Sequence, residues 1–212
     1  MKINYDLKLK EELELIKGTT PKLLLHVCCG PCCSNVVKEL SEYFDITLYY
    51  SNSNISPYEE YQRRLNELKT FITQFNIDYD QHIEIIEDDY DHNEWYTNEV
   101  PVKDFPEGSV RCHLCYSLRM RRCYDYAFKH NFDYWTTVLS VSPHKDSQVI
   151  NQIGAQWTDK CKFLYADFKK NDGFLKSTQM TKEYGMYRQN YCGCEFSYAE
   201  MLEREERKHM NE

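Results

Sequence analysis

Short apolar segments alternate with amphipathic helical segments along most of this chain, and this alternation restricts the folds it can adopt. The apolar segments have the length of buried strands, and the intervening segments repeat apolar residues at helical spacing. We expect strands at residues 22–27, 46–50, 82–86, 134–139 and 162–165. Strands that alternate with helices join through right-handed crossovers, so the sequence predicts an α/β fold with a parallel sheet of about five strands and helices on both faces.

The chain length and the helical segments indicate a simple domain organisation. Helices are expected at residues 5–16, 34–44, 57–72, 112–129, 145–153, 172–184 and 198–207, with an irregular stretch from 87 to about Ser109. A chain of 212 residues fits one domain that buries a core without disulfides. We therefore expect residues 1–212 to form a single domain, with 1–20 as an N-terminal helical extension and 195–212 as a C-terminal helix.

The N-terminal residues carry no apolar signal region. No apolar stretch approaches the ~20 residues that a membrane-spanning helix requires. The sequence therefore predicts a cytoplasmic protein without a membrane partner. Thiols stay reduced in that compartment, where clustered cysteines are typical of metal ligands or catalytic pairs rather than structural cross-links.

Ten cysteines are present, and most of them fall into three clusters. The clusters are Cys28-Cys29-Gly30-Pro31-Cys32-Cys33, the pair Cys112 and Cys115, and Cys192-Gly193-Cys194. The first cluster lies on a predicted strand-to-helix turn, and residues 140–145 follow a later strand. Because binding sites of parallel sheets lie at the carboxyl ends of the strands, we expect both segments to face one crevice. Cys123 and Cys161 are interpreted as packing residues.

Cys112 and Cys115 are three residues apart at the start of a predicted helix, so their sulfurs share one face. The positive end of the helix dipole is expected to lower the pKa of both thiols and favour the thiolate, which is the ligand form. With Cys28 and Cys29, whose sulfurs the turn can direct at one centre, they supply four thiolates from two rigid elements. Four cysteines hold a cubane iron-sulfur cluster or a tetrahedral zinc, so we expect a metallo-domain.

A structural zinc module is one alternative, since Cys29-x-x-Cys32 and Cys112-x-x-Cys115 form two ligand pairs. The gap between the pairs far exceeds the ~15 to 20 residues typical of compact zinc modules. Zinc would also leave Cys28, Cys33 and the third cluster unexplained. A redox cluster accounts for more of the chain.

A thioredoxin-like thiol-disulfide oxidoreductase is the stronger alternative. Cys29-Gly30-Pro31-Cys32 is the active-site tetrapeptide of thioredoxin, and it follows a predicted strand as that motif requires. The flanking Cys28 and Cys33, the missing tryptophan before the motif and the greater chain length argue against this interpretation.

The third cluster, Cys192-Gly193-Cys194, has one residue between its thiols. A disulfide between them would close a very small, strained ring, and strain makes such a bond easy to reduce. The spacing therefore suits a reversible dithiol that relays two electrons.

The charge distribution is uneven although the net charge is -8. An acidic run at residues 78–94 is interpreted as a solvated face. A basic run at 111–130 begins inside the second cysteine cluster, and it is interpreted either as a solvated face or as a surface for a phosphate-bearing substrate.

Four sequence strings together resemble the cobalamin-independent epoxyqueuosine reductase family over residues 23–197. The strings are Leu25-His26-Val27-Cys28-Cys29-Gly30-Pro31-Cys32, Arg111-Cys112-His113-Leu114-Cys115-Tyr116-Ser117-Leu118-Arg119, Ser142-Pro143-His144-Lys145 and Tyr187-Arg188-Gln189-Asn190-Tyr191-Cys192-Gly193-Cys194. The resemblance implies the last step of queuosine synthesis, in which the epoxide oxygen of epoxyqueuosine is removed at the wobble position of the tRNA anticodon.

The same resemblance implies the cofactors and part of the site. Cys28, Cys29, Cys112 and Cys115 correspond to ligands of a 4Fe-4S cluster. Cys192 and Cys194 correspond to a redox-active pair. An additional mononuclear iron is implied beside the cluster, with Cys32 as its candidate ligand.

The resemblance also implies a Rossmann-like fold of the adenine-nucleotide-hydrolase type. The glycine- and serine-rich phosphate loop of such domains is absent after the first predicted strand, where cysteines stand instead. We therefore expect no use of ATP. The implied partners are a tRNA with a queuosine-type anticodon and an external electron donor.

Reduction of an epoxide to an alkene takes two electrons and two protons, so an acid is needed at the oxygen. The candidate proton donors are His26, His144, Tyr187 and Tyr191, and His26 is equally a candidate partner that supports the cluster ligands. An anticodon base is usually read by stacking and by a grip on neighbouring phosphates, which makes binding salt-dependent. The candidate substrate-binding residues are Arg111, Arg119, Lys145 and Arg188.

Overall fold

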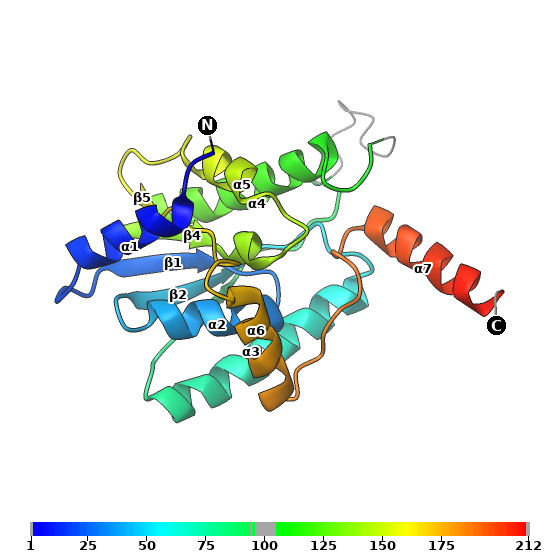
Figure 1. Cartoon of the computed structure of the whole chain (residues 1–212), viewed down its shortest axis with the longest axis horizontal. Coiled ribbons are helices and arrows are strands. Elements are labelled where there is room, and N and C mark those ends of the chain that lie inside the picture. The colour runs from blue at the N-terminus through cyan, green and yellow to red at the C-terminus, as the bar shows by residue number, and fades with distance from the viewer. Residues whose placement is uncertain (1, 94, 96–104, 211–212) are drawn as a thin grey trace.

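A computed structural model describes residues 2–93, 95 and 105–210 of the chain. Its centre is a five-stranded, all-parallel sheet in the order β3-β2-β1-β4-β5 (Figure 1). The strands are β1 (Lys22–His26), β2 (Asp45–Tyr50), β3 (Glu84–Glu87), β4 (Tyr134–Thr137) and β5 (Lys162–Phe163). The helices are α1 (Tyr5–Leu15), α2 (Gly30–Leu40), α3 (Tyr58–Tyr79), α4 (Val110–Lys129), the 3-10 helix η2 (Val138–Val141), α5 (Ser147–Gly154), α6 (Gly173–Glu183) and α7 (Glu195–His209).

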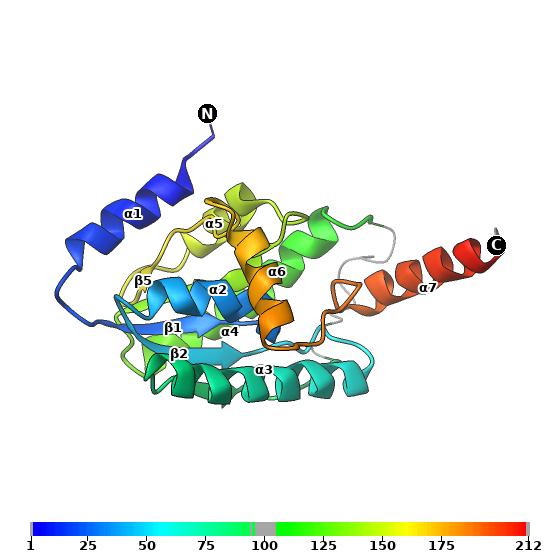
Figure 2. The same ribbon diagram turned by 60° about the horizontal axis from the view of Figure 1, so that its bottom comes forward.

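The predicted fold class is confirmed, because the strands alternate with helices that cover both faces of the parallel sheet. Helices α2, α3 and α6 lie on one face and α4 and α5 on the other (Figures 1 and 2). The strand order reverses between β1 and β4, which are paired from Leu23 and Tyr134 onward. In open parallel sheets the binding crevice lies at such a switch point, outside the carboxyl ends of the strands.

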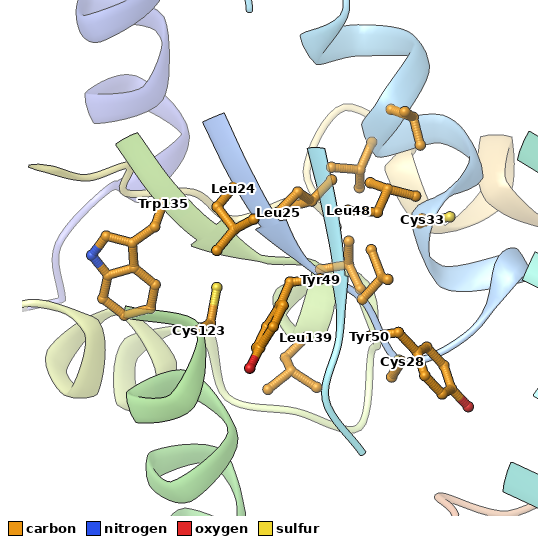
Figure 3. Packing of buried hydrophobic residues seen from close by; sticks show 14 of the residues in the cluster. Leu24, Leu25, Cys28, Cys33, Leu48, Tyr49, Tyr50, Cys123, Trp135 and Leu139 are labelled. Atoms are coloured by element: carbon orange, nitrogen blue, oxygen red, sulfur yellow. The ribbon is translucent and has the colours of Figure 1, made fainter. Parts of the chain in front are cut away.

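Alternating residues of the central strands fill the core on either side of the sheet. Tyr49 packs on Tyr126 of α4 at 4.9 Å between ring centroids, whereas its neighbour Tyr50 packs on Tyr61 of α3 at 5.1 Å. Figure 3 shows Cys123 of α4 near Tyr49 and Trp135. Cys123 and Cys161 are fully enclosed in this apolar cluster. The prediction that they are packing residues is confirmed.

Helix α2 begins four residues earlier than predicted, at Gly30 instead of Ser34. The Cys29 thiol caps the helix by accepting a hydrogen bond from the Cys32 backbone N–H at 3.4 Å. Proline in the first turn is compatible with this start, because its missing N–H has no helical partner there. The result is that Cys32 and Cys33 lie inside the first turn of the helix.

The terminal helices differ in how they attach to the sheet. Tyr5 of α1 stacks on Tyr165 at 5.7 Å between ring centroids, and Glu12 accepts a hydrogen bond from the Tyr134 hydroxyl at 2.6 Å. Helix α7 extends away from the sheet (Figures 1 and 2). Within the described ranges, no helix combines the length and apolar character needed to cross a membrane.

Some predicted features include residues that the structure does not describe. Met1 and residues 211–212 belong to the predicted terminal helical segments, and residues 94 and 96–104 belong to the predicted irregular stretch. The assignment of residues 1–212 to a single metallo-domain stays a prediction.

Candidate active site

Three thiols of the first cysteine cluster gather at the end of β1. The sulfurs of Cys28, Cys29 and Cys32 all lie within 4.8 Å of one another, and those of Cys28 and Cys29 are 3.8 Å apart. The turn after β1 directs Cys28 and Cys29 to the same side, and the early start of α2 adds Cys32. Thiolates are ligands of zinc and of iron-sulfur clusters, so this group is chemically able to hold a metal.

The three thiols have unequal pKa values. Hydrogen bonds from the thiols of Cys29 and Cys32 lower the pKa of Cys28 well below its usual value, and nearby Lys145 and Arg119 lower it further. Burial and the negative charge on Cys28 raise the pKa of Cys29 to about 12. The first thiolate of the group therefore forms at Cys28.

The second cluster occupies the first two turns of α4. Cys112 and Cys115 are both 8% exposed, and the Cys112 sulfur accepts a hydrogen bond from the Gly108 backbone N–H at 3.2 Å. The pKa of both thiols is raised by burial, that of Cys115 to about 12. The expected lowering by the helix dipole was wrong, because desolvation outweighs the dipole at these buried positions.

Two cavities adjoin these thiols. One, here called the cationic cavity, has a volume of ≈ 330 Å³ and lies against the turn after β1, the start of α2, the end of η2, α6 and the segment before α7. Its walls include Cys28, Cys32, His144, Lys145, Ser177, Arg188, Gln189, Tyr191, Cys192 and Arg204. The other, here called the apolar cavity, has a volume of ≈ 250 Å³. Its walls include Asn54, Arg111, Cys112, Leu114, Cys115, Leu118, Cys192, Cys194 and Phe196.

Cys192 contributes to the walls of both cavities, so the third cluster lies between the other two. The expectation that Cys28 and residues 140–145 face one crevice is supported, because Cys28 and residues 141–145 line the cationic cavity. In the described part of the chain, the sulfurs close enough to one another to hold one metal ion are those of Cys28, Cys29 and Cys32. Neither Cys112 nor Cys115 belongs to this group. The convergence of all these thiols on one centre stays a prediction.

A buried arginine of α3 holds the third cluster in place. Arg64 is 1% exposed, and its guanidinium donates to the carbonyl oxygens of Cys192 at 2.9 Å and Tyr191 at 3.4 Å. Its Nε donates to Glu60 at 2.7 Å, which neutralises the buried charge. Cys192 and Cys194 are free, half-buried thiols in this structure.

Gln189 is a site residue that the sequence analysis missed. Its side-chain amide donates to the Cys29 sulfur at 3.1 Å, and its buried Oε1 has no hydrogen-bond partner. Gln189 also lines the cationic cavity. A lone glutamine inside a cysteine-containing string carries no chemical signal, so only the folded arrangement reveals this contact.

Comparisons with known proteins agree with this arrangement. The family model described as epoxyqueuosine reductase QueH matches residues 23–200. The chain belongs to the QueH family. An epoxyqueuosine reductase QueH of Streptococcus pyogenes serotype M1 is 38% identical over 200 residues, covering 92% of this chain and 78% of that protein. The QueH protein of Thermotoga maritima is 33% identical over 186 residues, covering 86% and 93%.

The solved structures that share the fold of this QueH family member include that of the U34-tRNA thiolase NcsA from Methanococcus maripaludis with its [4Fe-4S] cluster, with a TM-score of 0.50 and 13% sequence identity. The match covers 97% of this chain and 73% of that chain. At this identity the likeness shows the fold alone, and it agrees with the predicted adenine-nucleotide-hydrolase type of α/β domain.

The predicted proton donors of this QueH family member occupy different environments. His26 is fully buried, with Nδ1 2.8 Å from the Thr137 hydroxyl and Nε2 3.2 Å from the Ser51 carbonyl oxygen, and burial lowers its pKa to about 3. The Tyr187 hydroxyl is 3.3 Å from both carboxylate oxygens of Glu60. Tyr191 lines the cationic cavity and donates to the Ser56 carbonyl oxygen at 3.1 Å.

The predicted substrate-binding cations are also separated by the fold. Lys145 and Arg188 line the cationic cavity, together with Arg204, which was not predicted. Arg111 lines the apolar cavity, where it pairs with Glu200 at 3.4 Å. Arg119 is only 3% exposed and lines neither cavity.

Membership of the QueH family does not favour the thioredoxin-like alternative or the structural zinc module. The site geometry gives a reason against each. A thioredoxin-type nucleophile needs an exposed thiol of low pKa, whereas Cys29 is 1% exposed and its pKa is raised. A zinc held by the two Cys-x-x-Cys pairs needs four converging sulfurs. In the part of the chain described, Cys112 and Cys115 stand outside the Cys28, Cys29 and Cys32 group.

Proposed function

We propose that this chain is an epoxyqueuosine reductase that converts epoxyqueuosine in tRNA to queuosine at the cationic cavity. One observation carries the proposal: in a member of the QueH family, a group of three thiols borders a cavity walled by Lys145 and Arg188. The reaction takes up two electrons and two protons, breaks both carbon-oxygen bonds of the epoxide and releases water.

The thiol positions fit an iron-sulfur centre. Cys28, Cys29, Cys112 and Cys115 would hold the 4Fe-4S cluster, and Cys32 would serve an additional iron. Thiols are the ligands that such clusters use, and the sulfurs around a cluster are spread more widely than those around one ion. Buried Arg119 has two N–H positions without a partner, which suits a neighbouring group of negative charge. When bound, the centre supplies single electrons, and an iron with an open position supplies Lewis acidity.

The side chains of the cavity would position the tRNA and hold the protons. Arg188 and Lys145 are suited to anticodon phosphates, because both line the cavity and Arg188 is exposed. Tyr191 and His144 would be the proton donors, since both line the cavity while His26 and Tyr187 do not. Burial raises the pKa of Tyr191, so its hydroxyl keeps its proton at neutral pH.

Cys192 and Cys194 would act as a reversible dithiol beside the centre. Cys192 lies on the walls of both cavities, with Cys28 on one side and Cys112 and Cys115 on the other. In this role the two thiols form a disulfide when they release two electrons and two protons, and an external donor reduces them again. We retain the expectation that the reaction does not use ATP.

Mass analysis of tRNA nucleosides tests the function. Cells that lack this chain and encode no second reductase should accumulate epoxyqueuosine, and the wild-type chain should restore queuosine. Cys28→Ser should fail to restore it, whereas Cys161→Ala, which alters a buried packing residue, should restore it. Unchanged queuosine in the deletion strain would overturn the proposal.

A further inference from the structure

Arg119 occupies an interior position between two groups of cysteines. It lies one helical turn after Cys115 on α4, so both side chains project from one face of the helix. Its Nη1 donates to the Asn52 side-chain oxygen at 3.1 Å, and the Asn52 amide donates to the Val27 carbonyl oxygen at 2.9 Å. Arg119 is thereby tied to the residue that precedes Cys28.

The charge of Arg119 lacks the usual compensation. Its Nε and Nη2 are buried and have no hydrogen-bond partner. Among the ion pairs of the described residues, none joins Arg119 to a carboxylate, whereas buried Arg64 pairs with Glu60 at 2.7 Å. A buried, unpaired charge is strongly unfavourable, so a native fold that keeps one places another charge beside it.

The groups that act most on the charge of Arg119 are cysteine thiols, which are negative only as thiolates. Burial alone would lower the pKa of Arg119, but Cys115, Cys28 and Cys192 raise it above its usual value. These residues come from α4, from the end of β1 and from the segment before α7. By geometry, Arg119 lies one helical turn from Cys115 and is joined through Asn52 to the residue before Cys28.

We propose that Arg119 is a positioning residue, the internal counter-cation of the sulfur ligands, and not a contact to tRNA phosphate. The proposal rests on the proposed function, because it assumes that the clustered thiols hold an iron-sulfur centre. Arg119 stabilises the negative charge of that centre with its guanidinium and with its two unpartnered N–H positions. A fixed positive charge favours addition of an electron, so Arg119 raises the reduction potential of the centre.

Three substitutions at Arg119 distinguish the effect of its positive charge from the effect of its side-chain shape. Arg119→Lys keeps the positive charge, whereas Arg119→Met and Arg119→Gln remove it. Arg119→Gln retains a polar group for Asn52 and provides the neutral variant if Arg119→Met does not fold. Arg188→Met is the matched control, since Arg188 is exposed on the wall of the cationic cavity.

The full-length variants, purified without oxygen, are compared by iron and sulfide content, midpoint potential, circular dichroism and tRNA binding at several salt concentrations. Both neutral variants should lose most of their iron or shift the midpoint potential to more negative values. Arg119→Lys should stay close to the wild type. None of the Arg119 variants should change the salt dependence of tRNA binding. Arg188→Met should keep its iron and reduce the salt slope by about one.

Two results would overturn the proposal. One is a folded neutral variant with wild-type iron content and midpoint potential. The other is an Arg119 variant that lowers the salt slope as Arg188→Met does, which would make Arg119 a phosphate contact. If no variant and no wild-type chain binds tRNA, the proposed function fails, but the iron and potential measurements still decide the role of Arg119.

Discussion

Arg64 of α3 donates a hydrogen bond from Nη1 to the carbonyl oxygen of Cys192 at 2.9 Å, across 128 positions of sequence. The same guanidinium pairs with Glu60, and the Arg64 and Glu60 side chains are 1% and 9% exposed. A helix on one face of the sheet therefore holds the backbone that carries the third cysteine cluster. The position of Cys192 between the two cavities depends on this contact.

Arg64→Met should destabilise the fold by about 3–5 kcal/mol, because it leaves Glu60 buried without its partner. It should also free the segment around Cys192 and speed alkylation of that thiol. Urea unfolding and mass-resolved alkylation measure the two effects. Arg121→Met removes the exposed pair with Asp125 and should cost less than about 1 kcal/mol. Equal costs for the two variants would contradict the role of Arg64.

Gly193→Ala should be destabilising for two reasons. Gly193 has φ +129, which side-chain-bearing residues rarely adopt, and an added Cβ would lie 2.8 Å from Nη1 of Arg64. We expect a loss of about 1–3 kcal/mol in urea unfolding. Gly18→Ala is the control, since Gly18 has φ +81 but no atom within 4 Å of an added Cβ. A larger loss for Gly18→Ala would show that contact with Arg64 is unimportant.

Gln189→Glu should lower activity on tRNA, because a carboxylate cannot donate to the Cys29 sulfur and places negative charge beside it. Substitution of a residue that supports a metal ligand typically costs 10–100-fold in metal affinity or activity. Iron content and kcat/KM are the measurements. Gln152→Glu makes the same change at an exposed position of α5 that lines neither cavity, and it should have little effect. Wild-type values for Gln189→Glu would remove Gln189 from the site.

Cys115→Ser and Cys123→Ala distinguish ligand from packing cysteines on one helix. Cys115→Ser should abolish the colour and activity of the anaerobically purified protein, because serine replaces a thiolate ligand. Cys123→Ala should keep both and lose some stability, since Cys123 is fully buried between α4 and the sheet. Absorbance, iron content and thermal unfolding provide the comparison. A coloured, active Cys115→Ser protein would contradict the ligand assignment.

Acid should weaken the attachment of α1 through Glu12. Burial raises the pKa of Glu12, but hydrogen bonds from Lys162 and Tyr134 lower it more, so its pKa is below the usual 4.5. The folded protein therefore holds the proton less tightly than the unfolded chain. This contribution to stability is present above pH 4.5 and is lost as pH falls through the native pKa. Glu12→Gln should reduce stability at pH 7 and make its decline below pH 4.5 less steep, as measured by urea unfolding.

Much of the fold was predictable because local sequence patterns determine its strands and helices. The spacing of apolar residues indicates the alternation of strands and helices, and this alternation correctly predicted the parallel sheet. Cys28 and Cys29 had to follow the first strand, because the apolar run ends there. The boundaries were less accurate. Helix α2 starts at Gly30 because the Cys29 thiol caps it, a contact that periodicity does not reveal.

The sequence by itself determined the family, the sheet and the identity of the clustered thiols. The tertiary structure decided which charged side chains and thiols are buried and which groups they contact. Arg119 resembled a phosphate contact within a basic run, but folding places it inside beside the cysteines. Cys115 was expected to ionise easily at a helix start, but burial raises its pKa. Burial and long-range pairing depend on segments far apart in the chain, and no local spacing encodes them.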